Sequence, residues 1–225
     1  MNKQDYDRPI NVLDEVRIKP LLEQINKKGI EFKYFVSLDY PRRTSNYNKV
    51  ISDNKFLKRE LQEFFGSDVR CLFFIEKHTG ANGAPHSGCY HRHILTEEPS
   101  LNTRQVHSYL LNRDPDGLFQ LRMEGTLSDE SKLKMMENAF RSSKTTCNSK
   151  KGTHIHRIQS NLNRVLAYAS KQYERFHPSY EVLDPSSSDI DCSFLLQYKQ
   201  DGLEYKTRPI HLPKGTAGTL QFAYR

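Results

Sequence analysis

Two stretches near the middle of the chain decide the fold: VRCLFFIE at residues 69–76 and CYHRHIL at residues 89–95. The first is an almost continuous apolar run, which is typical of a strand in the interior of a sheet. The residues between them contain Asn82-Gly83, a dipeptide typical of a tight loop. We therefore expect two neighbouring strands joined by a loop.

Further strands and helices follow on both sides of this pair. Residues 31–40 alternate between apolar and polar positions, with Phe35, Ser37 and Asp39 on one side, as in a half-buried strand. Other strands are expected over residues 118–123 and 153–158.

Five helices are expected. The first covers residues 11–28, with a potential break at Pro20, the second runs from a cap at Ser52 to Gly66, and the third from a cap at Asn102 to Leu111. The last two cover residues 128–140 and 161–175. The pattern predicts an α+β protein with about five strands.

The chain divides into a main domain over residues 1–176, which includes the N-terminal helix, and a tail over residues 177–225. The tail has Pro178, Pro185 and a run of serines, and we expect it to be irregular or to form a small hairpin near residues 200–202.

The charge balance favours a polyanionic partner. With 34 Lys and Arg against 27 Asp and Glu, the formal net charge is +7 and the sequence pI is about 9.1. Such a surplus attracts nucleic acid by long-range steering and counterion release, although solvated surface lysines are an alternative explanation.

The four cysteines are scattered without a CxxC pair, which favours a reducing compartment. The first ten residues lack the apolar centre of a signal peptide, and no stretch approaches about 18 apolar residues. We expect a cytoplasmic protein with no membrane partner.

The histidines of the second stretch indicate a metal site. On a strand, His91 and His93 share one face while Arg92 points to the other. Glu76 ends the neighbouring strand and can supply an oxygen ligand, and His78 shares its face if that strand continues. Two histidines and one carboxylate leave positions open for a phosphate and water.

A second pair of this kind, His154 and His156, warns that such pairs also arise by chance. The apolar strand that ends in Glu76 favours the first pair as the metal site. For the second pair we expect a polar strand face near the nucleic acid.

The helix predicted over residues 161–175 carries a candidate nucleophile. At about 100° per residue, Arg164, Tyr168 and Lys171 lie on one flank and Tyr173 lies in the apolar stripe. The apolar stripe also contains Leu162, Val165, Leu166 and Ala169. The pattern predicts an exposed Tyr168 and a packed Tyr173.

A tyrosine needs help to act as a nucleophile near neutral pH, because its reference pKa is about 10. A metal ion can neutralise charge on a phosphate, and Lys171 can stabilise the same charge or the phenolate. An ordinary solvated lysine is the alternative. Gln172 lies on another flank and is a further candidate for the metal shell.

The strand ending in Glu76, the tripeptide His91-Arg92-His93 and the segment Tyr168-Ala169-Ser170-Lys171 resemble the HUH endonuclease superfamily, especially its single-tyrosine rolling-circle replication initiators. The three segments occur in the family's order, and the resemblance covers residues 32–173. It implies a central antiparallel sheet flanked by helices. The family's usual middle residue is hydrophobic, whereas this chain has Arg92.

The resemblance further implies a Mg²⁺- or Mn²⁺-dependent enzyme that nicks and rejoins one DNA strand at an origin of a plasmid, virus or other mobile element. By position, Glu76, His91 and His93 match the metal ligands, Tyr168 the nucleophile that forms a 5′-phosphotyrosyl link, and Lys171 its accompanying lysine. A free 3′-hydroxyl is left for a polymerase. The chain has no GxxxxGK[ST] motif, so we expect a host helicase to open the duplex.

Six basic residues are candidates for DNA contacts, with solvation as the alternative for each. They are Arg42, Arg43, Arg92, Lys150, Lys151 and Arg164.

Three other functions stay open. A single-tyrosine transposase often has a glutamine four residues after the tyrosine, where this chain has Gln172, and a relaxase shares the same chemistry. A non-catalytic nucleic-acid-binding module could instead hold structural zinc with Cys89, His91 and His93, although Zn²⁺ prefers four protein ligands and no CxxC partner is evident.

Overall fold

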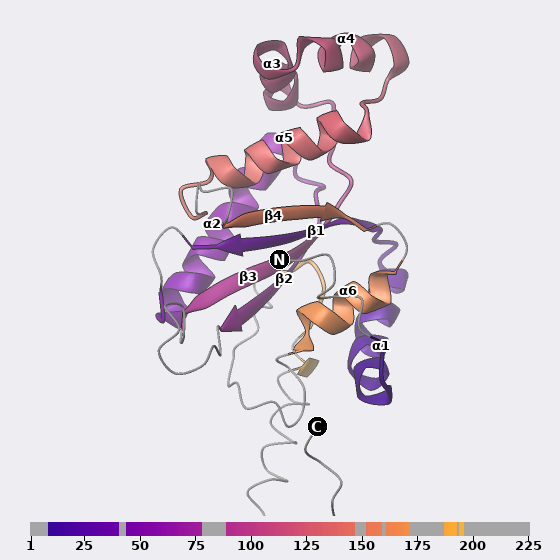
Figure 1. Cartoon of the computed structure of the whole chain (residues 1–225), viewed down its shortest axis with the longest axis vertical. Coiled ribbons are helices and arrows are strands. Elements are labelled where there is room, and N and C mark those ends of the chain that lie inside the picture. The colour runs from indigo at the N-terminus through magenta and orange to yellow at the C-terminus, as the bar shows by residue number, and fades with distance from the viewer. Residues whose placement is uncertain are drawn as a thin grey trace, which may run out of the picture.

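The chain folds around an antiparallel sheet whose strands are β1 (Phe32–Asp39), β2 (Cys71–Lys77), β3 (Tyr90–Glu97) and β4 (Thr153–Arg157) (Figure 1). The helices are α1 (Val12–Lys27), α2 (Tyr47–Phe65), α3 (Arg104–Arg113), α4 (Pro115–Glu124), α5 (Asp129–Ser142) and α6 (Leu162–Ala169). The computed structural model describes residues 9–40, 44–77, 89–146, 152–158, 161–171, 187–192 and 194–195. Within these ranges the sheet has four strands in the order β2-β3-β1-β4. The predicted α+β class is confirmed, with one strand fewer than expected.

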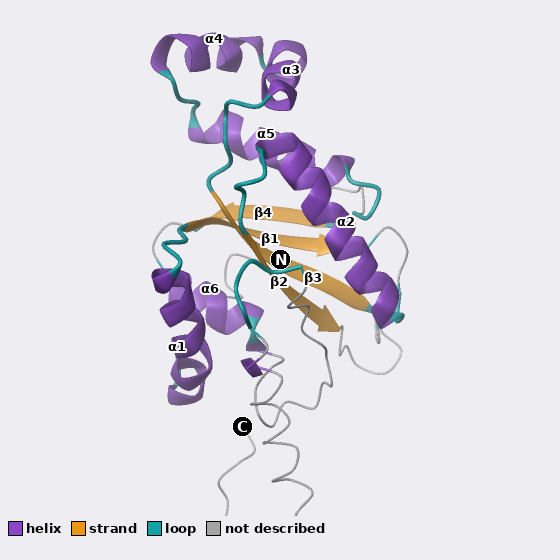
Figure 2. Cartoon of the chain, turned by 180° about the vertical axis from the view of Figure 1, so that it is seen from behind, coloured by secondary structure: helices purple, strands orange, loops and turns teal. Residues whose placement is uncertain are grey.

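The two faces of the sheet are covered by different helices. Side chains such as Tyr34 and Phe73 pack with residues of α2 and α5, whereas Phe35 and Phe74 pack with residues of α1 and α6. Figure 2 shows α2 and α5 in front of the sheet, and Figure 1 shows α1 and α6 on the opposite side. Helices α3 and α4 lie beyond α5, away from the strands. The period-two alternation of the strands therefore separates two apolar layers.

The predicted pairing of the two strands in the middle of the chain is confirmed. Strands β2 and β3 are antiparallel neighbours, with Glu76 opposite His91 and Phe74 opposite His93. Strand β1 lies on the other side of β3, where Ser37 pairs with His93. Ser37 also pairs with His154 of the edge strand β4. Both histidine pairs thus face the same side of the sheet.

Helix boundaries were predicted less accurately than helix positions. Helix α2 begins at Tyr47, where the Asn46 side chain accepts a hydrogen bond from the Lys49 amide, rather than at a Ser52 cap. Its first turn is held because Val50 is buried against Ile75 of β2. Helix α3 is capped by Thr103 instead of Asn102. Helix α1 continues through Pro20 without a break.

The strand predicted over residues 118–123 is wrong, because these residues lie in α4. Asp114 caps this helix by accepting a hydrogen bond from the Gly117 amide, and a proline occupies the first helical position. Gly125 ends it in the left-handed conformation, with φ +70°. Leu118 and Leu121, three residues apart, supply the buried side of the helix. The capping residues on both sides outweigh the weak strand pattern.

Part of the predicted tail packs against the edge of the sheet. The Cys71 amide donates to a carboxylate oxygen of Asp189 at 2.7 Å, and the Phe73 amide donates to the Ser188 hydroxyl at 3.0 Å. Ile190 and Leu195 are buried in the layer of α1 and α6. These contacts supply hydrogen-bond acceptors to two backbone amides at the outer edge of β2. The hairpin predicted near residues 200–202 lies outside the described residues.

In the described part of the chain, no helix is long and apolar enough to span a lipid bilayer.

Candidate metal and tyrosine site

Glu76, His91 and His93 form a compact group at the end of the β2–β3 pair. The Nε2 atoms of His91 and His93 lie 3.0 Å and 2.6 Å from the Oε2 atom of Glu76 and 3.2 Å from each other. This is the group of potential ligands found among the described residues, and Cys89 is not part of it. The predicted set of two histidines and one carboxylate is therefore brought together.

The spacing of these atoms suits one shared metal ion. Two ligands at right angles around an ion, each with a bond of about 2.1 Å, lie about 3.0 Å apart. The three observed separations lie close to this value, so the atoms can occupy one face of a coordination shell and leave the other positions open. The mixed nitrogen and oxygen set suits a transition-metal ion such as Mn²⁺ better than Ca²⁺, which prefers oxygen ligands alone.

The charges of the group favour cation binding. Burial alone would raise the pKa of the Glu76 carboxyl, but hydrogen bonds from His91 and His93 outweigh it and hold that pKa well below its usual range. Burial lowers the pKa of His93 to about 3. The site therefore presents an ionised carboxylate and a neutral imidazole at neutral pH, which are the protonation states that a metal ion requires.

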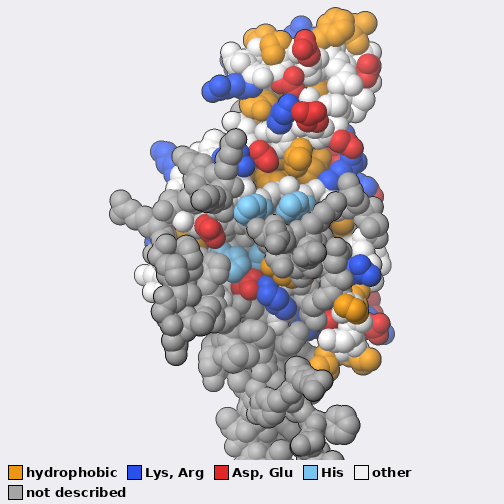
Figure 3. All heavy atoms as spheres, in the orientation of Figure 1, with side chains coloured by type: hydrophobic (Ala, Val, Ile, Leu, Met, Phe, Trp, Pro, Cys, Tyr) orange, Lys and Arg blue, Asp and Glu red, His pale blue; other side chains and the backbone are white. Residues whose placement is uncertain are grey.

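Helix α6 places Tyr168 beside this group, and Lys171, which follows its C-cap, also lies there. The Nζ atom of Lys171 lies 2.6 Å from Oε2 of Glu76 and 3.8 Å from the centre of the Tyr168 ring. The Tyr168 ring centre lies 5.4 Å from that of His93. Tyr168 is half-buried rather than exposed, because its ring also packs edge-on against Phe35 of β1. Figure 3, which views this face, shows an acidic and a basic side chain next to histidine.

Helix α6 is fixed to the sheet and to α1. Val165 and Leu166 are buried in the layer between the sheet and α1. The buried Arg17 of α1 donates to the Ser170 hydroxyl at 2.9 Å and to the Ala167 carbonyl at 3.1 Å. Ser170 caps the helix, so α6 ends at Ala169 instead of Arg175 as predicted. The N-terminal helix thereby anchors the backbone on both sides of Tyr168.

Arg17 was not identified from the sequence. It is 1% exposed, and its charge is paired with the buried Asp14 at 2.6 Å. Asp14 also completes a capping box with Asn11 at the start of α1. An acidic residue three positions before an arginine on a helix is a common surface pattern. That spacing therefore gives no signal of burial.

Two residues of β1 support His93; alternation had predicted that they share one face of their own strand, but had given them no role. The Phe35 ring stacks on the His93 ring, with centres 5.3 Å apart and an angle of 26° between the planes. The Ser37 hydroxyl lies 2.7 Å from Nδ1 of His93. Strand β1 thus supports the candidate ligand His93 of its neighbour β3.

Arg92, the unusual middle residue, is fully buried on the opposite face of the sheet. Its guanidinium donates to the Asn54 side chain at 3.1 Å and to the Thr146 hydroxyl at 2.9 Å, and it lies 4.5 Å from the centre of the Tyr40 ring. It also donates to the Thr145 carbonyl at 2.5 Å. The predicted DNA contact of Arg92 is therefore wrong for this arrangement, and its role is to join β3 to α2 and to the end of α5.

The other candidates fall into two groups. Arg164 is half-buried in the first turn of α6, and His154 and His156 are half-buried on the face of the metal group. Their expected DNA contacts remain predictions. Several residues lie outside the described ranges: Arg42, Arg43, His78, Lys150, Lys151, Gln172 and Tyr173.

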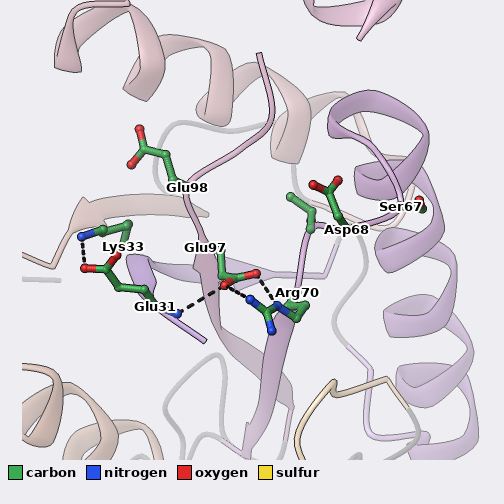
Figure 4. Close-up of a pocket in the computed structure, with 8 residues that line it drawn as sticks. Glu31, Lys33, Ser67, Asp68, Arg70, Glu97 and Glu98 are labelled. Atoms are coloured by element: carbon green, nitrogen blue, oxygen red, sulfur yellow. Dashed lines mark hydrogen bonds and ion pairs between the residues drawn. The ribbon is translucent and has the colours of Figure 1, made fainter. Parts of the chain in front are cut away.

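A polar pocket of about 550 Å³ lies at the other end of the sheet (Figure 4). Its centre is a bidentate ion pair in which Arg70 donates to Glu97 at 2.6 Å and 2.7 Å. The Glu31 amide also donates to Glu97, at 3.2 Å. Glu97 is at the opposite end of β3 from His91, so this pocket is separate from the candidate site.

Comparison of the chain with protein-family models, curated proteins and solved structures finds no match.

Proposed function

We propose that the chain is a metal-dependent endonuclease that nicks and rejoins single-stranded DNA at a specific sequence through a 5′-phosphotyrosine intermediate, and so initiates rolling-circle replication of a mobile element. The main support is the contact of Lys171 with Glu76, residues 95 positions apart, because it sets the tyrosine-bearing helix on the candidate metal ligands. Neither a structural metal site nor a plain binding surface needs a tyrosine and a lysine at this position.

Each residue has a separate task in this reaction. Glu76, His91 and His93 would hold a divalent ion, which when bound supplies charge stabilisation on the scissile phosphate. The Tyr168 hydroxyl is the nucleophile, and its ring is held in place by Phe35 and His93. The Lys171 ammonium beside that ring stabilises negative charge on the phenolate and on the phosphate oxygens.

The bonds balance without a further reactant. The Tyr168 oxygen forms a bond to phosphorus, the bond from phosphorus to the 3′ oxygen breaks, and the phenol proton is passed to the departing 3′ oxygen through solvent. The 5′ end stays on the tyrosine. The free 3′-hydroxyl can prime a polymerase or attack the phosphotyrosine in the reverse reaction, which reseals the strand.

The same site also suits the related chemistry of a single-tyrosine transposase or a relaxase. A stem-loop substrate that is excised would favour a transposase, whereas nicking of a supercoiled origin would favour a replication initiator. A zinc-stabilised binding module is less well supported, because Cys89 is not part of the ligand group among the described residues.

The proposal is tested by trapping the covalent intermediate. The protein is incubated with Mn²⁺ and a random-sequence pool of single-stranded oligonucleotides, and the products are separated on a denaturing gel. We expect a protein–DNA adduct that is absent from Tyr168→Phe and from samples with chelator. Mass spectrometry should place the phosphodiester on Tyr168.

Two controls separate the nucleophile from other tyrosines. Tyr173→Phe changes a near neighbour in sequence, and Tyr109→Phe changes a tyrosine that packs with the layer on the other face of the sheet. Both should form the adduct. An adduct that survives in Tyr168→Phe, or stoichiometric zinc without any DNA cleavage, would overturn the proposed function.

A further inference from the structure

We propose that Ser37 is a positioning residue for the metal site: its hydroxyl oxygen accepts a hydrogen bond from Nδ1–H of His93 and so keeps the Nε2 lone pair directed at the metal ion. This inference rests on the proposed metal site and assigns a role to a strand that supplies none of its ligands.

The geometry of the pair is restrictive. Ser37 and His93 are opposite one another in the register of β1 and β3, and both are buried, at 7% and 1% exposure. The Ser37 hydroxyl lies 2.7 Å from Nδ1 of His93, while Nε2 on the other side of the ring lies 2.6 Å from Oε2 of Glu76. The two ring nitrogens are therefore committed to different partners.

A neutral imidazole has one N–H group and one nitrogen with a free lone pair. Only the nitrogen with the lone pair can bind a metal ion, and the other nitrogen is a hydrogen-bond donor. When Nε2 uses its lone pair for a metal ion, the single ring proton must be on Nδ1. A buried N–H without an acceptor is costly, so this tautomer needs an acceptor in place of water. The Ser37 oxygen is at hydrogen-bond distance from Nδ1 and can accept a hydrogen bond from this N–H group.

A serine hydroxyl also suits the state without metal. There the carboxylate of Glu76 can accept a hydrogen bond from Nε2–H, and Nδ1 then accepts a hydrogen bond from the hydroxyl. Because a hydroxyl is both a donor and an acceptor, Ser37 can satisfy either tautomer without moving. A carboxylate at this position could satisfy only one of them.

Phe35 completes the support from the same strand. It lies two residues before Ser37, on the same face, and stacks on the His93 ring with 26° between the planes. Stacking on Phe35 limits tilting of the His93 ring. The hydrogen bond to Ser37 limits rotation of that ring about its Cβ–Cγ bond. Only the hydrogen bond selects the tautomer, so Ser37 and Phe35 make separable contributions.

The expected effect is specific to the metal. Loss of a hydrogen-bond partner behind a metal-bound histidine typically weakens metal binding by about 10–100-fold. We expect this loss in Ser37→Ala, with recovery in Ser37→Thr, which retains the hydroxyl. Thr96→Val is the matched control, because it removes a buried hydroxyl from the opposite face of β3.

Two measurements on the full chain test the inference. Mn²⁺ affinity is measured for each variant by electron paramagnetic resonance of the free ion, with thermal unfolding in chelator as the check on folding. Long-range ¹⁵N NMR of the imidazoles is then recorded with Zn²⁺ as a diamagnetic probe. The wild type should show a protonated Nδ1 for His93, and Ser37→Ala should show a mixture of tautomers. A mere packing defect would not change the tautomer.

Activity provides a third readout. The rate of adduct formation in Ser37→Ala should recover at high Mn²⁺, because the nucleophile is unaffected. If the wild type binds Mn²⁺ but Ser37→Ala binds it equally well, the role of Ser37 is disproved while the metal site stands. If the wild type binds no divalent ion, the proposed function fails and this inference fails with it.

Discussion

The Nζ atom of Lys171 and the Nε2 atoms of His91 and His93 all lie within 3.0 Å of the same carboxylate oxygen, Oε2 of Glu76. Lys171 is thus in the immediate environment of the candidate metal ion, and its Nζ atom also lies 3.8 Å from the centre of the Tyr168 ring. In the proposed reaction its positive charge would oppose metal binding and assist the tyrosine.

Replacement of Lys171 by methionine should therefore have opposite effects on the two steps. Removal of a cation next to Glu76 raises the affinity for Mn²⁺, because a repulsive charge is lost. Removal of the same cation from Tyr168 lowers the rate of adduct formation by at least about tenfold. Metal titration and single-turnover kinetics measure the two effects. Lys171→Arg, which retains the charge, is the control, and a parallel fall in both quantities would contradict this division of roles.

Acid should destabilise the metal-free protein through His93. Its pKa is lowered to about 3 in the fold, against 6.5 for an ordinary histidine, so between these values the unfolded state binds more protons. The free energy of unfolding therefore falls as the pH is lowered from about 6.5 to about 3, by up to about 1.4 kcal/mol per pH unit. The lowered pKa of Glu76 acts in the same direction at the acidic end of this range.

Urea unfolding at a series of pH values measures this slope. His93→Gln should reduce the slope between pH 6 and pH 4 by about one proton, whatever its effect on absolute stability. His107→Gln, at an exposed position on α3, is the control for the histidine-to-glutamine change itself. An equal slope in wild type and His93→Gln would show that His93 is not buried in the neutral form.

Arg17 should be essential to the attachment of α6. Arg17→Met removes the guanidinium from the buried Asp14 carboxylate, which is expected to destabilise the fold by about 3–5 kcal/mol. The double variant Asp14→Asn, Arg17→Met should recover part of this loss, because the buried carboxylate charge is removed as well. Amide exchange at residues 166–170 should increase in both. Unchanged exchange there would mean that Arg17 does not hold the helix.

His154 and His156 should contribute to DNA binding without taking part in the chemistry. They lie on the face of the metal group, two strands away from β3, so we expect the double alanine variant to raise KM for single-stranded DNA and to leave kcat and Mn²⁺ affinity unchanged. His107→Ala is again the matched control. A fall in kcat with constant KM would instead place the second pair in the reaction.

The sequence was sufficient to predict that the three candidate metal ligands lie together, because their placement depends on local rules. Glu76 and His91 come from adjacent antiparallel strands joined by a loop, and His93 follows by alternation. The position of Tyr168 on the correct side of α6 also followed from helical periodicity. Its partial burial did not, because that depends on how the helix lies over Phe35.

The roles of Arg92 and Ser37 could not be predicted, because their partners are distant in the chain. Arg92 is opposite the metal face, where a charged residue would normally be excluded, and it is accommodated by Asn54 and by Thr145 near the end of α5. Ser37 required the register between β1 and β3. Helix α4 is a different case, because its capping residue Asp114 can be recognised in the sequence. The strand prediction over residues 118–123 followed a short apolar pattern instead.

The candidate ligands and the candidate nucleophile are attached to different parts of the fold. The three candidate ligands belong to one pair of strands, whereas Tyr168 belongs to a helix that is held by separate contacts to α1. Opening of that helix alone would leave a protein that retains its metal ion but cannot attack DNA. A ligand that separated α6 from the buried contacts of Arg17 on α1 would therefore block the proposed strand cleavage without competing for the ion.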